Sequence, residues 1–87
     1  MSSKILLVDN DIPLQTMLAE HLQKVYRVVT ASNGQETMRK AFIEHPHLVI
    51  IEVDLPGMDG WEVLRRIRAD ESLADVPVIM LSVLHEQ

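Results

Sequence analysis

Two continuous apolar runs in this chain, both rich in Ile, Leu and Val, each end at acidic residues. The runs cover residues 5–8 and 48–51. The polar residues that follow them are Asp9, Asn10, Asp11, Glu52 and Asp54. Apolar runs without polar alternation are typical of strands buried on both faces of a parallel sheet. Such strands end at one edge of the sheet, where open α/β folds bind ligands, so neighbouring strands would bring Asp9 and Glu52 together in an acidic pocket.

The rest of the chain alternates helical spacing with short β-branched runs. We expect strands at about residues 4–9, 27–31, 47–52 and 76–81, and helices at about 12–24, 34–44 and 60–69. Asp11 and Asp59 are residue types that cap helix N-termini, and Ser32, Asn33 and Gly34 supply turn and cap residues before the second helix. Pro46 would end that helix. Because crossovers between parallel strands are right-handed, this order predicts a doubly wound α/β sheet with helices on both faces.

Length, cysteine content and charge narrow the class of protein. The chain has 87 residues, enough for one small domain over residues 1–87, and no cysteine, which fits a reducing compartment such as the cytoplasm. No apolar stretch approaches the roughly 20 residues that span a bilayer, so we expect no membrane association. Eight basic against thirteen acidic residues give a net charge of -5, which disfavours direct nucleic-acid binding.

Three strings in register carry a family resemblance. They are KILLVDND near the start, LVIIEVDLPGMDGWEVLRRIR in the middle and VPVIMLS near the end. The acidic cluster, the LPGMDG loop and the hydroxyl after the fourth strand together resemble the receiver domain of two-component response regulators. The resemblance implies a flavodoxin-like fold, here with strand order 2-1-3-4 and truncated before the last strand and helices.

The resemblance also implies a role in phosphorelay signal transduction. Such a domain is a signalling module and not an enzyme. Its acidic pocket binds Mg²⁺, and an aspartate in the pocket takes a phosphoryl group from a histidine kinase. The partners implied are therefore proteins, a histidine kinase or another signalling protein.

The phosphoacceptor position departs from the family pattern. In the family it lies four residues before the loop proline, and counting back from Pro56 gives Glu52. The extra methylene displaces the nucleophile, and a misplacement of about 1 Å can cost on the order of 100-fold in rate. We therefore expect little or no phosphorylation, with Glu52 as a partial, built-in mimic of the phosphorylated state. Asp54 is a rival acceptor by chemistry, although its register matches the backbone carbonyl that the family offers to the metal.

The metal site departs from the pattern as well. Asn10 stands where the family has the second acidic ligand, and an amide keeps an oxygen but lowers the charge that hard Mg²⁺ prefers. We therefore expect a weak Mg²⁺ site, or none, formed by Asp9, Asn10, Glu52 and the Asp54 carbonyl. Asp11 lies close by, and we interpret it as a helix cap.

Of the two remaining family groups, the switch hydroxyl has a match in this sequence and the lysine does not. Ser82 matches the switch hydroxyl of the family, with Val83 beside it where a very small residue is usual. The family lysine follows a fifth strand, whereas this chain stops at Gln87, and its lysines, at 4, 24 and 40, lie elsewhere in the pattern. The cation that would neutralise a phosphoryl oxygen is therefore not expected.

The fourth strand is expected at an edge of the sheet, with apolar residues exposed. Ile79, Leu81, Val83 and Leu84 form a β-prone segment, so we expect self-association into a homo-oligomer. Three interpretations of function stay open: a phosphorylation-independent interaction module, a phosphoacceptor that uses Glu52 or Asp54, and an inert fragment of a larger regulator.

Overall fold

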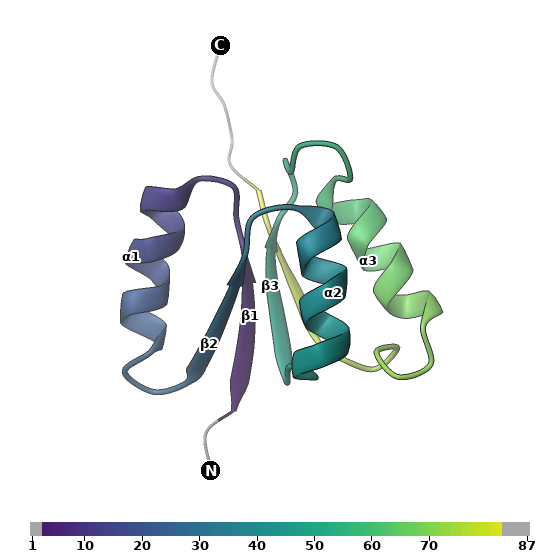
Figure 1. The fold of residues 1–87 in the computed structure, drawn as a ribbon, viewed down its shortest axis with the longest axis horizontal. Coiled ribbons are helices and arrows are strands. Elements are labelled where there is room, and N and C mark those ends of the chain that lie inside the picture. Colours follow the sequence, from purple (N-terminus) through teal and green to yellow (C-terminus); the bar gives the residue numbers. More distant parts are fainter. Residues whose placement is uncertain (1–2, 83–87) are drawn as a thin grey trace.

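Four parallel strands and three helices alternate along residues 3–82, the part of the chain that the computed structural model describes (Figure 1). The strands are β1 (Lys4–Val8), β2 (Arg27–Ala31), β3 (Leu48–Glu52) and β4 (Val78–Leu81). The helices are α1 (Ile12–Leu22), α2 (Gly34–Glu44) and α3 (Gly60–Ala69). The expected α/β alternation is confirmed, and no helix in this part of the chain has the length and apolar character needed to cross a bilayer.

The sheet has the order β2-β1-β3-β4, with every neighbouring pair parallel. This confirms the predicted 2-1-3-4 topology. The register pairs Val8 with Ile51 at the carboxyl ends of β1 and β3. Asp9 and Glu52 occupy the next position on each of these neighbouring segments, as the two apolar runs predicted.

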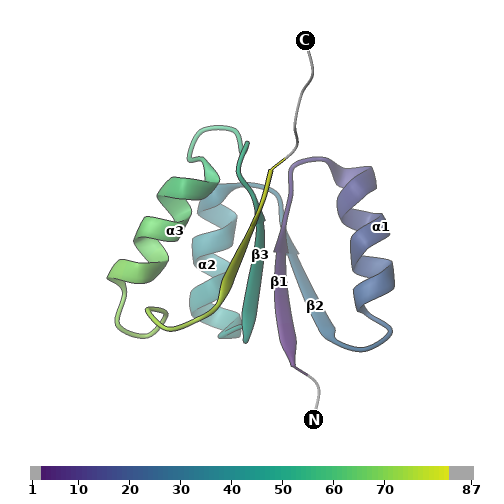
Figure 2. The same ribbon diagram turned by 180° about the vertical axis from the view of Figure 1, so that it is seen from behind.

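The helices divide between the two faces of the sheet. Figures 1 and 2 show α1 on one side and α2 and α3 on the other. Because side chains alternate along a strand, Leu6 and Val8 of β1 face α2 and α3 and join the buried cluster there, which includes Val49, Ile51 and Ile67. Burying each such side chain contributes about 1.5–3 kcal/mol, so this face holds most of the core.

Side-chain oxygens cap each helix, at Asp11 and Asp59 as predicted and at Asn33 within the predicted turn 32–34. The bonds run from Leu14 N–H to Asp11 Oδ1 at 3.1 Å, from Glu36 N–H to Asn33 Oδ1 at 2.8 Å and from Glu62 N–H to Asp59 Oδ1 at 2.9 Å. Each cap satisfies a backbone donor that the first helical turn leaves without a partner. Helix α2 ends at Glu44, and its C-cap residue His45 has a left-handed φ of 47° and precedes Pro46.

Two boundaries differ from the sequence prediction by two residues, and the end of β1 and the start of β3 differ by one. Helix α1 ends at Leu22 and not at residue 24, because the chain turns there and the Tyr26 N–H bonds to the Leu22 carbonyl at 2.8 Å. Strand β4 begins at Val78 and not at residue 76, because the Val76 N–H bonds back to Leu73 at 3.1 Å. Both corrections come from turn hydrogen bonds, which apolar periodicity does not reveal.

Candidate acidic site

Two buried carboxylates lie at the carboxyl edge of the sheet, on adjacent strands. Asp9 follows β1 and is 2% exposed, and Glu52 ends β3 and is 5% exposed. The Val8–Ile51 pairing brings their backbones side by side. Buried carboxylates are uncommon unless hydrogen-bonded or bound to a cation, so this pair marks the edge as a candidate site.

Backbone amides of the following loops hold one oxygen of each carboxylate. Asp9 Oδ1 accepts the Asp11 N–H at 2.9 Å, and Glu52 Oε1 accepts the Asp54 N–H at 3.2 Å. Asp9 Oδ2 is buried and has no hydrogen-bond partner among the described residues. An unsatisfied buried oxygen is costly, so Asp9 Oδ2 is the acceptor of this site at which a ligand would be most favourable.

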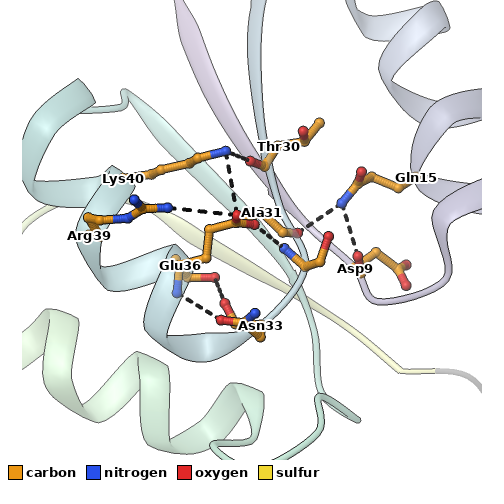
Figure 3. Close-up of polar contacts among 10 residues, drawn as sticks. Asp9, Gln15, Thr30, Ala31, Asn33, Glu36, Arg39 and Lys40 are labelled. Atoms are coloured by element: carbon orange, nitrogen blue, oxygen red, sulfur yellow. Dashed lines mark hydrogen bonds and ion pairs between the residues drawn. The ribbon is translucent and has the colours of Figure 1, made fainter.

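Gln15 supports the β1 end of the site. Its buried side-chain Nε2 donates to the carbonyls of Asp9 and Ala31, both at 2.9 Å, and so joins α1 to the ends of β1 and β2 (Figure 3). The Asp9 N–H also bonds to Ala31 O at 3.1 Å. Sequence reasoning missed Gln15; the available signal was a polar residue between the apolar positions of a helix expected to cover the sheet.

The other two residues of the first acidic cluster lie at the surface. Asn10 and Asp11 are exposed, and Asp11 Oδ1 is occupied as the cap of α1. Within residues 3–82 no three His, Cys, Asp or Glu side chains gather in a way that could hold a metal ion. The donors fit Mg²⁺ only in part: Asp9 offers a free buried oxygen, whereas a third carboxylate does not converge on it.

Gly60, the first residue of α3, lies close to the end of β3. The Gly60 N–H bonds to Val53 O at 2.9 Å, and a Cβ on Gly60 would lie 2.7 Å from the Glu52 carbonyl oxygen. Only glycine allows this approach of α3 to the end of β3. Asp54, between the two, is exposed.

Ser82 follows β4 at the same edge. Leu81, the last residue of β4, pairs with Glu52, and Ser82 is the next residue along the chain. The Ser82 side chain is exposed. Val83 and Leu84, which also entered the sequence interpretation, lie outside the described residues.

The three lysines either bond to groups outside the acidic site or lie away from it. Lys4 begins β1, at the opposite end of the sheet, and its Nζ donates to Glu44 Oε1 at 2.9 Å. Lys40 Nζ donates to the Thr30 carbonyl and lies near Glu36 (Figure 3). Lys24 is exposed beyond the C-terminus of α1. Among the described residues, then, we find no lysine placed beside Asp9 and Glu52.

Sequence comparison gives a consistent family match. Residues 5–87 match the family described as the response regulator receiver domain. The alkaline phosphatase synthesis transcriptional regulatory protein PhoP of Bacillus subtilis is 38% identical over 100% of this chain and 36% of that protein. A probable transcriptional regulator, ycf27, of Cyanophora paradoxa is 39% identical over 93% of this chain and 33% of that protein. The chain therefore spans about a third of the length of these curated relatives.

Solved structures agree with the sequence match. The chemotaxis response regulator CheY4 of Vibrio cholerae superposes with a TM-score of 0.92 and 30% identity, over 99% of this chain and 72% of that one. The N-terminal domain of a response regulator receiver protein from Methanoculleus marisnigri gives a TM-score of 0.91 and 32% identity, over 98% and 70% of the two chains. Sequence and fold thus point to the same family.

Proposed function

Because this chain belongs to the response regulator receiver domain family, we propose that it is a receiver-like module of phosphorelay signalling that acts through protein–protein contacts without being phosphorylated. Glu52 stands at the phosphoacceptor position in this proposal. No catalytic residue is assigned, and the module signals by the shape and charge of its surface.

The observation that carries the proposal is the state of Glu52. Its side chain is 5% exposed, and its Oε1 accepts the Asp54 N–H. A nucleophile must reach the phosphorus in line with the leaving group, and a buried, hydrogen-bonded carboxylate that is one methylene too long is poorly placed for this. A fixed negative charge at this depth instead resembles, in part, the charge that a phosphoryl group would bring.

The proposed metal site is weak or absent. Asp9, Asn10 and Glu52 would hold Mg²⁺ with the backbone carbonyl of Asp54, and the ion would supply charge neutralisation at the pocket. Asp9 Oδ2 favours such a ligand, and Asp9 lies beside Glu52. The exposed Asn10 amide and the capping role of Asp11 disfavour it.

The alternative function is a working phosphoacceptor that takes a phosphoryl group from a histidine kinase on Glu52 or Asp54. The exposure of Asp54 favours this alternative, since an exposed carboxylate is open to a phosphoryl donor. The position of Asp54 disfavours it, because Asp54 lies beyond the end of β3 and is exposed, whereas Asp9 and Glu52 are buried. Ser82 is the proposed switch hydroxyl in either case.

Incubation with acetyl phosphate and Mg²⁺, followed by intact mass measurement, separates the two functions. We expect no stable gain of one phosphoryl group, under conditions in which a receiver domain with aspartate at this position is modified. A gain that disappears in Glu52→Gln, or in Asp54→Asn, would establish the alternative and identify its acceptor. Glu52→Gln and Asp54→Asn are matched controls because both keep the side-chain size.

We also propose the extent, the cellular location and the partners of the module. Residues 1–87 form one receiver-like unit with a cytoplasmic location, which is where histidine kinases present phosphoryl groups to their partners. Its partners are proteins, including a second copy of the chain, and not nucleic acid. The net charge of -5 supports the last point.

A further inference from the structure

Helix α3 presents a basic surface on an acidic protein. Its buried side is formed by Gly60, Val63 and Ile67, and the other positions are exposed or half-buried. Three arginines against one glutamate give the helix a net charge of +2, whereas the whole chain carries -5. Figure 2 shows α3 beside α2, on the side of the sheet away from α1. We call the solvent side of this helix the α3 arginine face; its residues are Trp61, Glu62, Arg65, Arg66 and Arg68.

Two of the arginines are oriented by one shared carboxylate. Arg65 Nη2 donates to Glu62 Oε1, and Arg66 Nε donates to Glu62 Oε2 at 3.1 Å. A guanidinium has five N–H donors, so most donors on both side chains remain available to a partner. The two arginine side chains are 70% and 55% exposed, and ion pairs at such exposure contribute little to stability. A carboxylate of a partner can therefore join or replace Glu62 at small cost.

Arg68 adds a positive charge without a carboxylate partner among the described residues. Its Nη1 donates to the carbonyls of Ala74 and Val76, at 3.1 and 2.7 Å, and so holds the side chain against the segment between α3 and β4. Carbonyl acceptors satisfy donors but do not cancel the charge. Because the planar guanidinium is already held in place, it loses little conformational freedom when a carboxylate binds.

Trp61 adds an apolar anchor beside these charges. It precedes Arg65 by four positions and Arg68 by seven, the spacing that places side chains on one face of a helix. Its side chain is 52% exposed. Tryptophan and arginine are enriched among the residues that dominate binding energy at protein interfaces. The combination suits a ligand that carries carboxylates together with an apolar side chain.

We propose that the α3 arginine face binds a short acidic segment of a protein partner, with carboxylates on the arginines and an apolar side chain on Trp61. Charge complementarity selects this occupant. Asp59 and Asp70 cap the two ends of α3, so the positive stretch between them is about 15 Å long, or about three turns of a helix. Nucleic-acid affinity depends on many phosphate contacts, which so short a stretch on a chain of net charge -5 does not offer.

This inference rests on the proposed function in one respect, because it gives the chemistry of one protein partner. Its test measures peptide binding to the unphosphorylated chain, whereas the test of the proposed function measures a covalent modification. Phosphorylation of Glu52 or Asp54 would overturn the proposed function and leave the peptide result unchanged. Failure of one is therefore distinguishable from failure of the other.

Fluorescence anisotropy of a labelled, helix-forming peptide of about 15 residues tests the proposal on the full 87-residue chain. The peptide carries glutamates at i, i+3 and i+4 spacing around one phenylalanine. We expect saturable binding that is at least about tenfold weaker when glutamine replaces every glutamate, a difference that shrinks at high salt. Equal binding of the glutamine peptide would overturn the proposal. So would tighter binding of a single-stranded DNA of similar length.

Variants locate the contact on the molecule. Arg65→Gln and Trp61→Ala should each weaken binding of the glutamate peptide by about three- to tenfold. Both positions are exposed and both new residues are good helix formers, so the variants should fold, as far-UV circular dichroism will show. Arg27→Gln is the matched control, because Arg27 is an exposed arginine at the start of β2, at the other edge of the sheet, and should leave the affinity unchanged.

Two results with these variants would contradict the proposed contact. Wild-type affinity in both Arg65→Gln and Trp61→Ala would show that the peptide binds elsewhere, and would overturn the proposal. A loss in Arg27→Gln as large as that in Arg65→Gln would show that the net charge of the chain governs binding, and would overturn it as well.

Discussion

Gln15 holds Asp9 in place through the main chain and not through the carboxylate: the Gln15 amide donates to the Asp9 carbonyl oxygen at 2.9 Å. The second hydrogen of the same amide goes to Ala31 O. One buried side chain thus connects α1, β1 and β2 just below the acidic site. The carboxylate of Asp9 stays free of this contact, and Oδ2 keeps its open acceptor.

Replacing Gln15 should lower stability. Gln15→Met keeps the size of the side chain and removes both hydrogen bonds, which leaves the buried Asp9 carbonyl without that partner. We expect the free energy of unfolding to fall by about 1–3 kcal/mol in urea titrations. Gln35→Met, at an exposed position of α2, is the control and should change it by less than about 0.5 kcal/mol. Equal effects of the two substitutions would contradict this role of Gln15.

Removing the charge of Asp9 should raise stability in the absence of divalent cations. Asp9→Asn replaces a buried carboxylate, one oxygen of which has no hydrogen-bond partner among the described residues, by a neutral amide. We expect a gain of about 1–2 kcal/mol in the unfolding free energy with a chelator present. Asp11→Asn is the control, because asparagine caps a helix as well as aspartate and should leave stability nearly unchanged.

Mg²⁺ should have a small effect on the wild-type chain. A ligand at a concentration near its dissociation constant stabilises the folded state by only about 0.4 kcal/mol, so a weak site gives a shift of that order at millimolar Mg²⁺. Thermal unfolding with and without the ion measures it, and the shift should vanish in Asp9→Asn. A stabilisation of several kcal/mol would show that the exposed Asn10 amide does not weaken the site.

Substitution of Gly60 should separate α3 from β3. Gly60→Ala would place a Cβ 2.7 Å from the Glu52 carbonyl oxygen, a backbone atom that cannot move aside. We expect a loss of about 1–3 kcal/mol. Gly57→Ala is informative beside it: its added Cβ meets nothing within 4 Å, and only the positive φ of 77° opposes it. Gly57→Ala should therefore cost less, about 1 kcal/mol. If Gly60→Ala were the milder variant, the close approach at Glu52 would not be the constraint.

Acid should weaken the opposite end of the sheet through Glu44. A hydrogen bond from Lys4, together with the charge of its ammonium group, holds the pKa of Glu44 below its usual 4.5. A lowered pKa means that this stabilisation is present above the ordinary value and is lost as pH falls through the lowered one. Urea midpoints measured over the acid range should therefore converge for wild type and Glu44→Gln. Glu71→Gln, at an exposed carboxylate, should give no such convergence.

Much of the fold could be predicted from short sequence features. The apolar runs before Asp9 and Glu52 predicted neighbouring parallel strands, and capping residues predicted the starts of the helices. The structure confirms both. Strand β4 was expected too early, because Val76 is β-branched but belongs to a turn whose hydrogen bond to Leu73 depends on tertiary packing.

The site was predictable in position but not in detail. The register of β1 and β3 follows from the sequence pattern, whereas the roles of Gln15 and Gly60 depend on contacts between elements that lie far apart along the chain. Helical spacing places Gln15 among apolar positions, but it does not indicate that the Gln15 amide lies within hydrogen-bond distance of two carbonyls. The loss of Asp11 to helix capping was anticipated, since aspartate before Pro13 is a common start of a helix.

The close approach of Gly60 to the end of β3 places an intrinsic fluorophore next to a residue that contacts the acidic site. Trp61, the single tryptophan, is the next residue and is half exposed. Any ligand or substitution that displaces the main chain at residue 52 must also displace the first turn of α3, and with it the indole ring. Its emission spectrum can therefore follow events at the carboxylates without a label.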